Sequence, residues 1–335
     1  MSVTRVATPY LVFLGAVTNP LDAKTGRGLV DWRPERCVGQ LRLAGCRVDL
    51  GLPDMSPADA VAAGAKSLVI GVAPTGGQLD GAWMDTLVEA LNAGLDLVGG
   101  MHTRLASIPE LATRAQVLKR RLVDVREPPP GLPVGSGRRR SGKRVLMVGT
   151  DCCVGKKYTA LALHRALEQA GRPATFRATG QTGILIAGSG IPMDAVVSDF
   201  LSGAAEALSP DNDAAHWDVI EGQGSLFHPA YAAVTLGLVH GSQADALVLC
   251  HEHGRATIDE YPDYPIPPLG ECIDAYLRAA RLTNPACRFV GVSLNTASLS
   301  PAQRPKALDA VSAETGLPCV DPLVNGVAPI VERLP

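Results

Sequence analysis

The sequence predicts an α/β protein with two domains, each built on a parallel sheet that carries helices on both faces. Three observations support this fold class. Strand and helix patterns alternate over the first 125 residues, a segment rich in proline and glycine follows, and a second alternation then begins with a glycine-containing loop. Each such series buries its strands between helices, so two series in 335 residues indicate two hydrophobic cores.

The first series combines short apolar runs, interpreted as strands, with longer mixed runs, interpreted as helices. The expected strands are 10–17, 46–51, 67–73, 95–100 and 122–125. The expected helices are 33–45, 56–64, 80–94 and 107–120. Ser56 should cap its helix, with Pro57 at the first helical position and Gly64 as the stop. This half contains no GxGxxG motif, so it gives no support for a dinucleotide site.

Segment 126–144 reads REPPPGLPVGSGRRRSGKR and is interpreted as a linker. We expect an N-terminal domain at 1–126, a linker at 127–143 and a second domain at 144–335. Anion binding is one reading of the basic run. The favoured reading is a solvated connector.

The second series starts with an expected strand at 144–148 and an expected helix at 155–170. A further strand is expected at 174–178. Short apolar strands that end in polar residues are expected within 216–225, 244–254 and 287–295. Ligands of such sheets bind beyond the carboxyl ends of the strands, so these polar ends should converge on one crevice.

Composition narrows the class of partner. The formal net charge is −2, which gives no electrostatic reason to expect nucleic acid or an anionic membrane. No signal peptide or membrane-length apolar run is visible, and the 8 cysteines show no CxxC pair. We therefore expect a cytoplasmic protein with reduced thiols that acts on a small molecule, and we expect a homo-oligomer.

The first chemical motif is the loop GTDCCVGKKYT between a strand and a helix. Gly149 and Gly155 allow successive N–H groups to face one anion, and Lys156 adds a full charge. The expected cofactor-binding residues are Gly149, Thr150, Asp151, Cys152, Cys153, Val154, Gly155, Lys156, Lys157, Tyr158 and Thr159.

The position after Gly-Lys usually carries a serine or threonine that binds Mg²⁺, and here it is Lys157. Lysine offers Mg²⁺ no oxygen, and the nearby hydroxyls of Thr150 and Thr159 do not stand in the usual position. We therefore expect no metal, and a cofactor whose phosphates are held rather than cleaved. Coenzyme A is one such cofactor.

Two resemblances follow from these residues. The loop GTDCCVGK is similar to that of dethiobiotin synthetase, whose strand-end glutamate and lysine correspond to Glu221 and Arg177. Over nearly the whole chain, the segments AKTGRGLVDWRPE, GTDCCVGKKYTALAL, GQTGILIAGSGIPMDAVVSDFLSGAAE, EGQGSLFHPAY and LCHEHGR resemble the D-glutamate N-acetyltransferase family. That resemblance implies a Rossmann-like first domain, a P-loop second domain, and acetyl transfer from acetyl-CoA to the amine of D-glutamate.

Acetyl transfer to an amine needs a general base and a donor for the oxyanion. The candidate catalytic residues follow strands of the second domain: Glu221, His228 and His251. Glu221 is read either as the base or as a carboxylate that orders Lys156. Each histidine could instead be a packed side chain.

A dicarboxylate acceptor calls for guanidinium and amide groups. The candidate substrate-binding residues are Arg177, Gln181, Thr182 and Arg255. The alternative for both arginines is an internal ion pair. In the first domain, the segment with Lys24, Thr25, Arg27 and Arg33 is expected to be an exposed loop, because it contains Gly26 and Gly28. One reading is a loop that covers the crevice and contacts the substrate, and the favoured reading is a plain surface loop.

Cys152 and Cys153 raise the possibility of an acetyl-cysteine intermediate, since a thiolate in this loop would lie near lysines and a helix N-terminus. Small side chains that fill the loop are the alternative, because covalent catalysis also needs an adjacent base. Two other functional classes remain open. One is an ATP-dependent ligase or kinase of the dethiobiotin synthetase type, and the other is a nucleotide-binding regulator without turnover.

Overall fold

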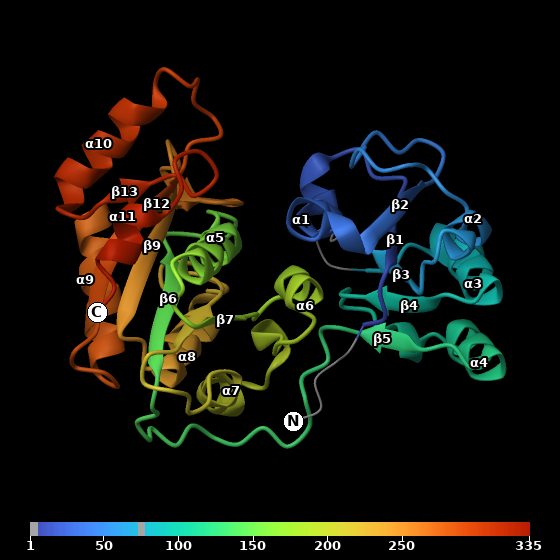
Figure 1. The fold of residues 1–335 in the computed structure, drawn as a ribbon, viewed down its shortest axis with the longest axis horizontal. Coiled ribbons are helices and arrows are strands. Elements are labelled where there is room, and N and C mark those ends of the chain that lie inside the picture. Colours follow the sequence, from blue (N-terminus) through green and yellow to red (C-terminus); the bar gives the residue numbers. More distant parts are fainter. Residues whose placement is uncertain (1–5, 73–77) are drawn as a thin grey trace. The chain divides into compact units, whose positions relative to one another are not determined.

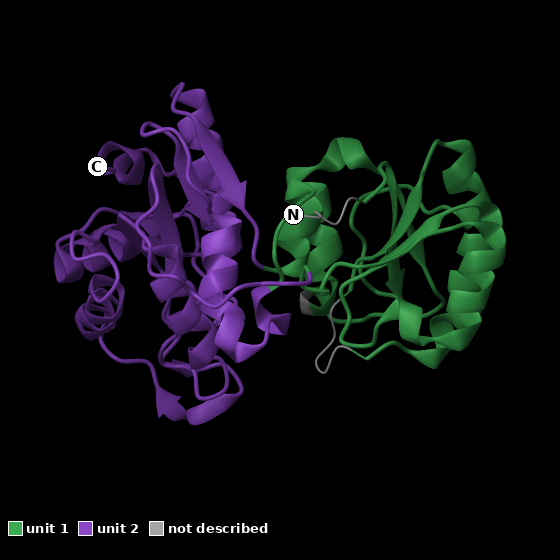
Figure 2. Ribbon diagram, turned by 90° about the horizontal axis from the view of Figure 1, so that it is seen from below, with its two compact units in different colours: residues 1–129, 180–192 green, residues 130–179, 193–335 purple. Residues whose placement is uncertain are grey.

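The computed structural model describes residues 6–72 and 78–335. The chain forms two compact units (Figure 2). Unit 1 comprises residues 1–129 and 180–192, and unit 2 comprises residues 130–179 and 193–335. The last residue of the strand expected at 67–73 lies outside the described residues.

Unit 1 is a five-stranded sheet in the order β2-β1-β3-β4-β5, and every pair of neighbouring strands is parallel. Its strands are β1 (Tyr10–Gly15), β2 (Cys37–Arg42), β3 (Ser67–Ile70), β4 (Asp96–Gly99) and β5 (Leu122–Asp124). Its helices are α1 (Lys24–Trp32), α2 (Pro57–Ala62), α3 (Met84–Ala93), α4 (Pro109–Leu118) and α6 (Gln181–Ala187). Short 3-10 helices are η1 (Pro20–Ala23), η2 (Pro34–Arg36), η3 (Gly81–Trp83) and η4 (Leu105–Ser107).

Local sequence signals decided several of these elements. The Ser56 hydroxyl accepts a hydrogen bond from the Asp59 N–H at 3.2 Å, which confirms the predicted cap of α2. Gly94 ends α3 at φ 102°, in the left-handed region that glycine tolerates. Strands β1, β3, β4 and β5 and helices α3 and α4 all lie within the expected segments.

The helix expected at 33–45 and the strand expected at 46–51 are both wrong. Residues 37–42 form β2, which pairs in parallel with β1, while 46–51 is irregular. Gly39 lies opposite Leu11, and a Cβ at Gly39 would stand 2.7 Å from the Met55 sulfur. A short apolar run fits a helix or a strand equally well, and pairing with β1 decided the outcome.

The exposed loop expected around Gly26 is also wrong, because residues 24–32 form helix α1. The Gly26 N–H donates to the Gly71 carbonyl at 2.7 Å, and a Cβ on Gly26 would stand 2.9 Å from Leu50 Cδ1. The glycine thus permits close packing of a helix on the sheet rather than a tight turn.

Unit 2 is a six-stranded sheet in the order β13-β12-β9-β6-β8-β7, again with parallel neighbours, and β6 lies inside it (Figure 1). Its strands are β6 (Lys143–Gly149), β7 (Ala174–Arg177), β8 (Trp217–Ile220), β9 (Ala246–Glu252), β12 (Arg288–Asn295) and β13 (Cys319–Val320). Strands β10 (Thr257–Ile258) and β11 (Tyr261–Pro265) form a separate antiparallel pair.

The helices of unit 2 are α5 (Lys156–Gln169), α7 (Leu201–Leu208), α8 (Ala232–Ser242), α9 (Leu269–Arg281), α10 (Arg304–Thr315) and α11 (Ala328–Glu332). Short 3-10 helices are η5 (Met193–Ala195) and η6 (Ser198–Phe200). The expected strand–loop–helix series is confirmed from β6 through β12. No helix among residues 6–72 and 78–335 is both long enough and apolar enough to span a bilayer.

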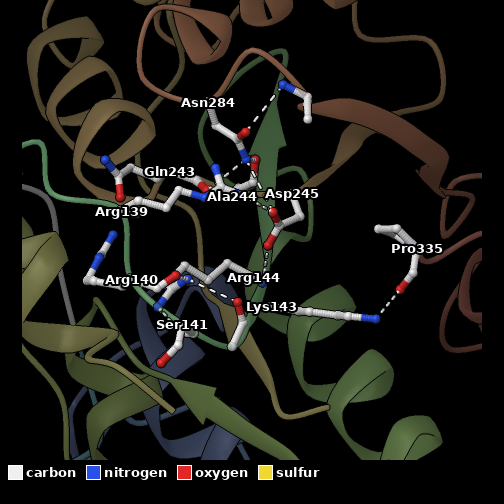
Figure 3. A network of polar contacts seen from close by, with 12 residues as sticks. Arg139, Arg140, Ser141, Lys143, Arg144, Gln243, Ala244, Asp245, Asn284 and Pro335 are labelled. Carbon is white, nitrogen blue, oxygen red and sulfur yellow. Dashed lines mark hydrogen bonds and ion pairs between the residues drawn. The ribbon is translucent and has the colours of Figure 1, made fainter. Parts of the chain in front are cut away.

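The basic run before β6 is partly buried, which corrects the expectation of a solvated connector. The Arg140 guanidinium donates to four backbone carbonyls at 2.5–3.0 Å, those of Glu206, Ser209, Gly241 and Ser242. Figure 3 shows the neighbouring contacts of Arg144 and Asp245, in which the Asp245 carboxylate accepts from the Arg144 N–H at 2.9 Å. Backbone carbonyls thus accept the hydrogen bonds that water would accept from an exposed arginine.

Residues 180–192, which the sequence analysis placed in the second domain, cluster with unit 1. The chain leaves unit 2 at Thr179 and returns at Met193, whose N–H donates to the Thr179 carbonyl at 3.0 Å. Within unit 1, α6 is held to α1 by the Thr25–Thr182 hydroxyl pair at 3.1 Å. A sequence pattern cannot reveal such an excursion, because the segment has the composition of an ordinary helix and loop.

Candidate active site

The phosphate loop occupies residues 150–155, between the end of β6 and the start of α5. Two residues in it have positive φ, Cys153 at 56° and Gly155 at 104°. Gly155 directly precedes the first residue of α5, so the loop curls against a helix N-terminus. This is the backbone form that directs N–H groups toward an anion.

Asp151 anchors the loop from within. Its carboxylate is fully buried and accepts from the Cys152 N–H at 2.6 Å, the Asp259 N–H at 2.9 Å and Arg255 Nη1 at 2.8 Å. Arg255 also donates to the Cys152 carbonyl at 3.1 Å and pairs with Glu252. Of the two readings of Arg255, the structure therefore shows the internal ion pair.

Two residues that the sequence analysis missed hold the start of the loop. The Tyr276 hydroxyl on α9 donates to the Gly149 carbonyl at 2.7 Å, and the Ser225 hydroxyl donates to the Thr150 carbonyl at 2.9 Å. Tyr276 is fully buried, and burial raises its pKa. Its position in an amphipathic helix reads as core, so the sequence offered no signal for its hydroxyl.

Lys156 is buried at 7% exposure, and its Nζ donates to the Asp151 carbonyl at 2.7 Å. Lys157 Nζ lies 4.9 Å from the centroid of the neighbouring Tyr158 ring. At the end of β8, Gly222 packs against the same lysine, because a Cβ there would stand 3.0 Å from Lys156 Cδ. The residue before it, Glu221, is buried at 5% exposure, and its Oε2 accepts from the Thr179 N–H at 2.9 Å.

The two hydroxyls that could have replaced the missing metal ligand are both engaged within the protein. Thr150 Oγ1 lies 2.8 Å from His251 Nδ1. Thr159 Oγ1 lies 2.8 Å from the Ser293 hydroxyl and donates to the Gly155 carbonyl at 3.1 Å. Both threonines are fully buried.

His251 lies near the end of β9, where its Nδ1 is in contact with the hydroxyl of Thr150 in the loop. Burial lowers its pKa to about 4, with Arg255 and His253 adding to the effect. The ring borders a cavity of about 240 Å³, whose apolar wall includes Leu269 and Leu294. A larger cavity of about 310 Å³ lies beside α10, and neither cavity has a residue of 150–155 in its lining.

His228 is 3% exposed and lies against the rings of Tyr231 and Tyr261, at centroid distances of 4.4 and 5.1 Å. Its Nδ1 accepts from the Ala230 N–H at 3.1 Å. One ring nitrogen, the Cys152 Sγ and an Asp151 oxygen all lie within 4.8 Å of one another. The cluster is a poor cation site, because the carboxylate already accepts three hydrogen bonds and Lys156 and Arg255 stand beside it.

The expected stabilisation of a thiolate is wrong for Cys152. Burial raises the pKa of this thiol to about 11 and outweighs the opposing effect of Lys156. Cys153 is exposed and has left-handed φ. The Cys152 side chain is therefore a neutral thiol that packs within the loop.

The predicted substrate-binding residues are divided between the two units. Arg177 Nε donates to Asp218 at 2.8 Å, and Asp218 is 1% exposed, so Arg177 also forms an internal ion pair. Gln181 and Thr182 lie on α6 in unit 1, whereas Arg177 and Arg255 lie in unit 2. Gln181 packs on Gly100, where a Cβ would stand 1.7 Å from its Oε1.

A parallel strand, a glycine loop and a helix that begins with a buried lysine define unit 2 as a P-loop domain, joined to a second α/β unit. The chain belongs to the DUF1611 family, a family described by domains of unknown function. The family's P-loop domain matches residues 133–331, and its N-terminal Rossmann-like domain matches residues 41–128. The predicted fold class is thereby confirmed.

Similar proteins cover almost the whole chain. A D-glutamate N-acetyltransferase from Tritonibacter scottomollicae is 50% identical over 98% of this chain and 99% of its own length. One of the same name from a Pseudoalteromonas species is 46% identical over 98% and 99%. The crystal structure of a DUF1611 family protein from Anabaena variabilis is 36% identical, covers 97% of this chain and 99% of its own, and has a TM-score of 0.87. These relatives confirm the resemblance read from the sequence.

Proposed function

We propose that this chain is an N-acetyltransferase that moves the acetyl group of acetyl-CoA to the amine of D-glutamate or a related amino acid. The observation that carries the proposal is a phosphate loop without a metal-binding hydroxyl: Lys157 stands at that position, and both nearby threonine hydroxyls are engaged. Such a loop suits a cofactor whose phosphates are gripped and left intact. The names of two relatives, 50% and 46% identical over nearly full length, support the same activity.

Among the three catalytic candidates, we propose Glu221 as the general base. Its carboxylate lies at the end of β8, beside the strand that carries the loop, and it is buried. Burial makes His251 a weaker base than an ordinary histidine, because it lowers the pKa to about 4. In the transfer, the amine nitrogen bonds to the acetyl carbon, the C–S bond breaks, and the proton lost by the amine ends on the CoA sulfur.

We further propose that the acceptor contacts Gln181 and Thr182, that the protein works in the cytoplasm, and that it forms a homo-oligomer. The net charge of −2 favours neither nucleic acid nor an anionic membrane as a partner. We also propose that the first domain and the P-loop domain expected from the sequence fold independently of each other, with the linker between them.

The experiment combines a turnover assay with a thermal-shift panel. We expect CoA thiol release with acetyl-CoA and D-glutamate, with L-glutamate as the comparison, and stabilisation by about 2.7 kcal/mol when acetyl-CoA is at 100 times its Kd. Stabilisation by ATP with Mg²⁺, together with ATP cleavage and no thiol release, would instead establish a ligase or kinase. Binding of a nucleotide without any turnover would indicate a regulator.

A further inference from the structure

We infer that His228 binds a phosphate oxygen of the cofactor through its Nε2–H and does not act as the general base. This inference rests on the proposed function only in taking CoA as the molecule held by the loop. The sequence analysis made His228 a candidate general base, and the structure gives it a different role. A candidate proton acceptor becomes a fixed hydrogen-bond donor.

The hydrogen bond at Nδ1 decides which nitrogen carries the proton. The Ala230 backbone N–H can only donate, so the Nδ1 that receives it at 3.1 Å presents a lone pair. In a neutral imidazole the proton then resides on Nε2. A protonated Nε2 has no lone pair with which to take a proton from an amine, and it can only donate.

The surroundings of His228 keep the ring neutral. It is 3% exposed and lies against two tyrosine rings. Burial is the largest effect and lowers its pKa, which outweighs the opposing effect of Asp151; Lys156 lowers the pKa further, and Asp259 and Glu260 oppose it by smaller amounts. A neutral ring beside the loop can donate to an anion without adding a charge that would need its own partner.

The nearby carboxylate does not compete strongly for this donor. Asp151 lies within 4.8 Å of a His228 nitrogen, yet its oxygens already accept from two backbone N–H groups and from Arg255. No hydrogen bond joins His228 to Asp151 in the described part of the chain. The Nε2–H is therefore available to a ligand at the beginning of the loop.

A phosphate oxygen fits this position better than the thioester. The ring lies beside Asp151 and Cys152, the second and third residues after β6, where the loop curls toward the start of α5. Backbone N–H groups and Lys156 make that place suited to phosphate. A thioester is uncharged and lies at the far end of the CoA molecule from its phosphates, so it has no comparable reason to bind here.

The test uses His228→Ala and His228→Gln in the full-length protein, with His102→Ala as the control, because His102 is exposed in unit 1. Binding of CoA and of pantetheine, which lacks phosphate, is measured by calorimetry. We expect His228→Ala to weaken CoA binding roughly 10- to 100-fold, the range for a lost hydrogen bond to a charged group. Pantetheine binding and kcat should change less than about 3-fold, and His228→Gln, whose amide N–H can reach the position of Nε2, should retain most of the affinity.

The tautomer gives a second readout that needs no activity. A two-bond ¹H–¹⁵N spectrum of the wild-type protein should show the proton of His228 on Nε2. Unchanged CoA binding in His228→Ala, with an equal fall of kcat in both variants, would overturn the inference and restore the base. A proton on Nδ1 would overturn it as well. Failure of the proposed function looks different, since wild-type protein would then bind no CoA or release no thiol.

Discussion

Arg255 Nη1 donates to Asp151 Oδ2 at 2.8 Å, and this contact fixes the phosphate loop to the segment that follows β9. Asp151 is completely buried, and the Arg255 side chain is 18% exposed. The two residues are 104 positions apart. The charge on Arg255 thus stabilises the phosphate loop itself, so its removal should affect the loop.

Arg255→Ala should destabilise the protein by roughly 3 kcal/mol, because it leaves a buried carboxylate with only its backbone partners. It should also raise the KM for acetyl-CoA, since the loop loses its anchor. Urea denaturation and steady-state kinetics measure the two effects. The control is Arg138→Ala, whose solvent-exposed pair with Asp211 should contribute little to stability. Equal stabilities of the two variants would contradict the assigned role.

Lys157→Thr should weaken acetyl-CoA binding by about 1–3 kcal/mol, if Lys157 supplies the charge that Mg²⁺ would otherwise bring. Lys156→Ala should weaken it at least as much. Both losses should appear in the KM for acetyl-CoA rather than in kcat, because the phosphates are held alike in the ground and transition states. Wild-type turnover should survive EDTA. An unchanged KM in Lys157→Thr, or activity that returns with Mg²⁺ after chelation, would reject this account.

Glu221→Gln should lower kcat about 10²- to 10⁴-fold, the usual contribution of a general base, with a small effect on the KM for acetyl-CoA. The amide keeps an oxygen that can accept the hydrogen bond of the Thr179 N–H, so the fold should be preserved. Stopped-flow thiol release and calorimetric CoA binding separate chemistry from binding. If CoA binding is lost and kcat at saturation is kept, Glu221 orders Lys156 instead.

The stability of the protein should fall between pH 6.5 and about 4 because of His251. Its pKa in the folded state is about 4, whereas the unfolded chain takes up a proton near its ordinary value of 6.5. The unfolded state therefore binds more protons in that window, and stability is lost as the pH falls through it, by roughly 3 kcal/mol at most. Urea midpoints of wild type and His251→Asn at pH 7 and pH 5 test this. A variant whose midpoint falls as steeply as that of the wild type would exclude His251 as the source.

Arg140→Ala should destabilise unit 2 by about 2–4 kcal/mol, because four backbone carbonyls lose their buried partner. The side chain of its neighbour Arg139 is 57% exposed and pairs with Asp245, which keeps the Arg144 N–H as a partner, so Arg139→Ala serves as the matched control with an effect below about 1 kcal/mol. Limited trypsin digestion gives an independent check. Cleavage should occur after Arg138 or Arg139, and early cleavage after Arg140 would show that this arginine is not packed.

The sequence by itself determined the elements whose signals are local. The Ser56 cap and the strand–loop–helix of residues 143–169 depend on neighbours within one turn or one loop, and both were predicted. The phosphate loop belongs to this class, because its glycines and its lysine act through the backbone they sit on. The replacement of the usual metal-binding hydroxyl by Lys157 could likewise be predicted, because it depends only on which residue stands at that position.

Tertiary structure decided what depends on partners distant in the chain. Residues 37–42 became a strand because β1 offered an open edge, and Gly26 entered a helix because the sheet required a close approach there. Arg177 and Arg255 carry the charge that a dicarboxylate would need. Arg177 instead pairs with Asp218, 41 positions away, and Arg255 pairs with Asp151, 104 positions away. A residue's type fixes which bonds it can make, but only the fold selects which partner arrives within 3 Å.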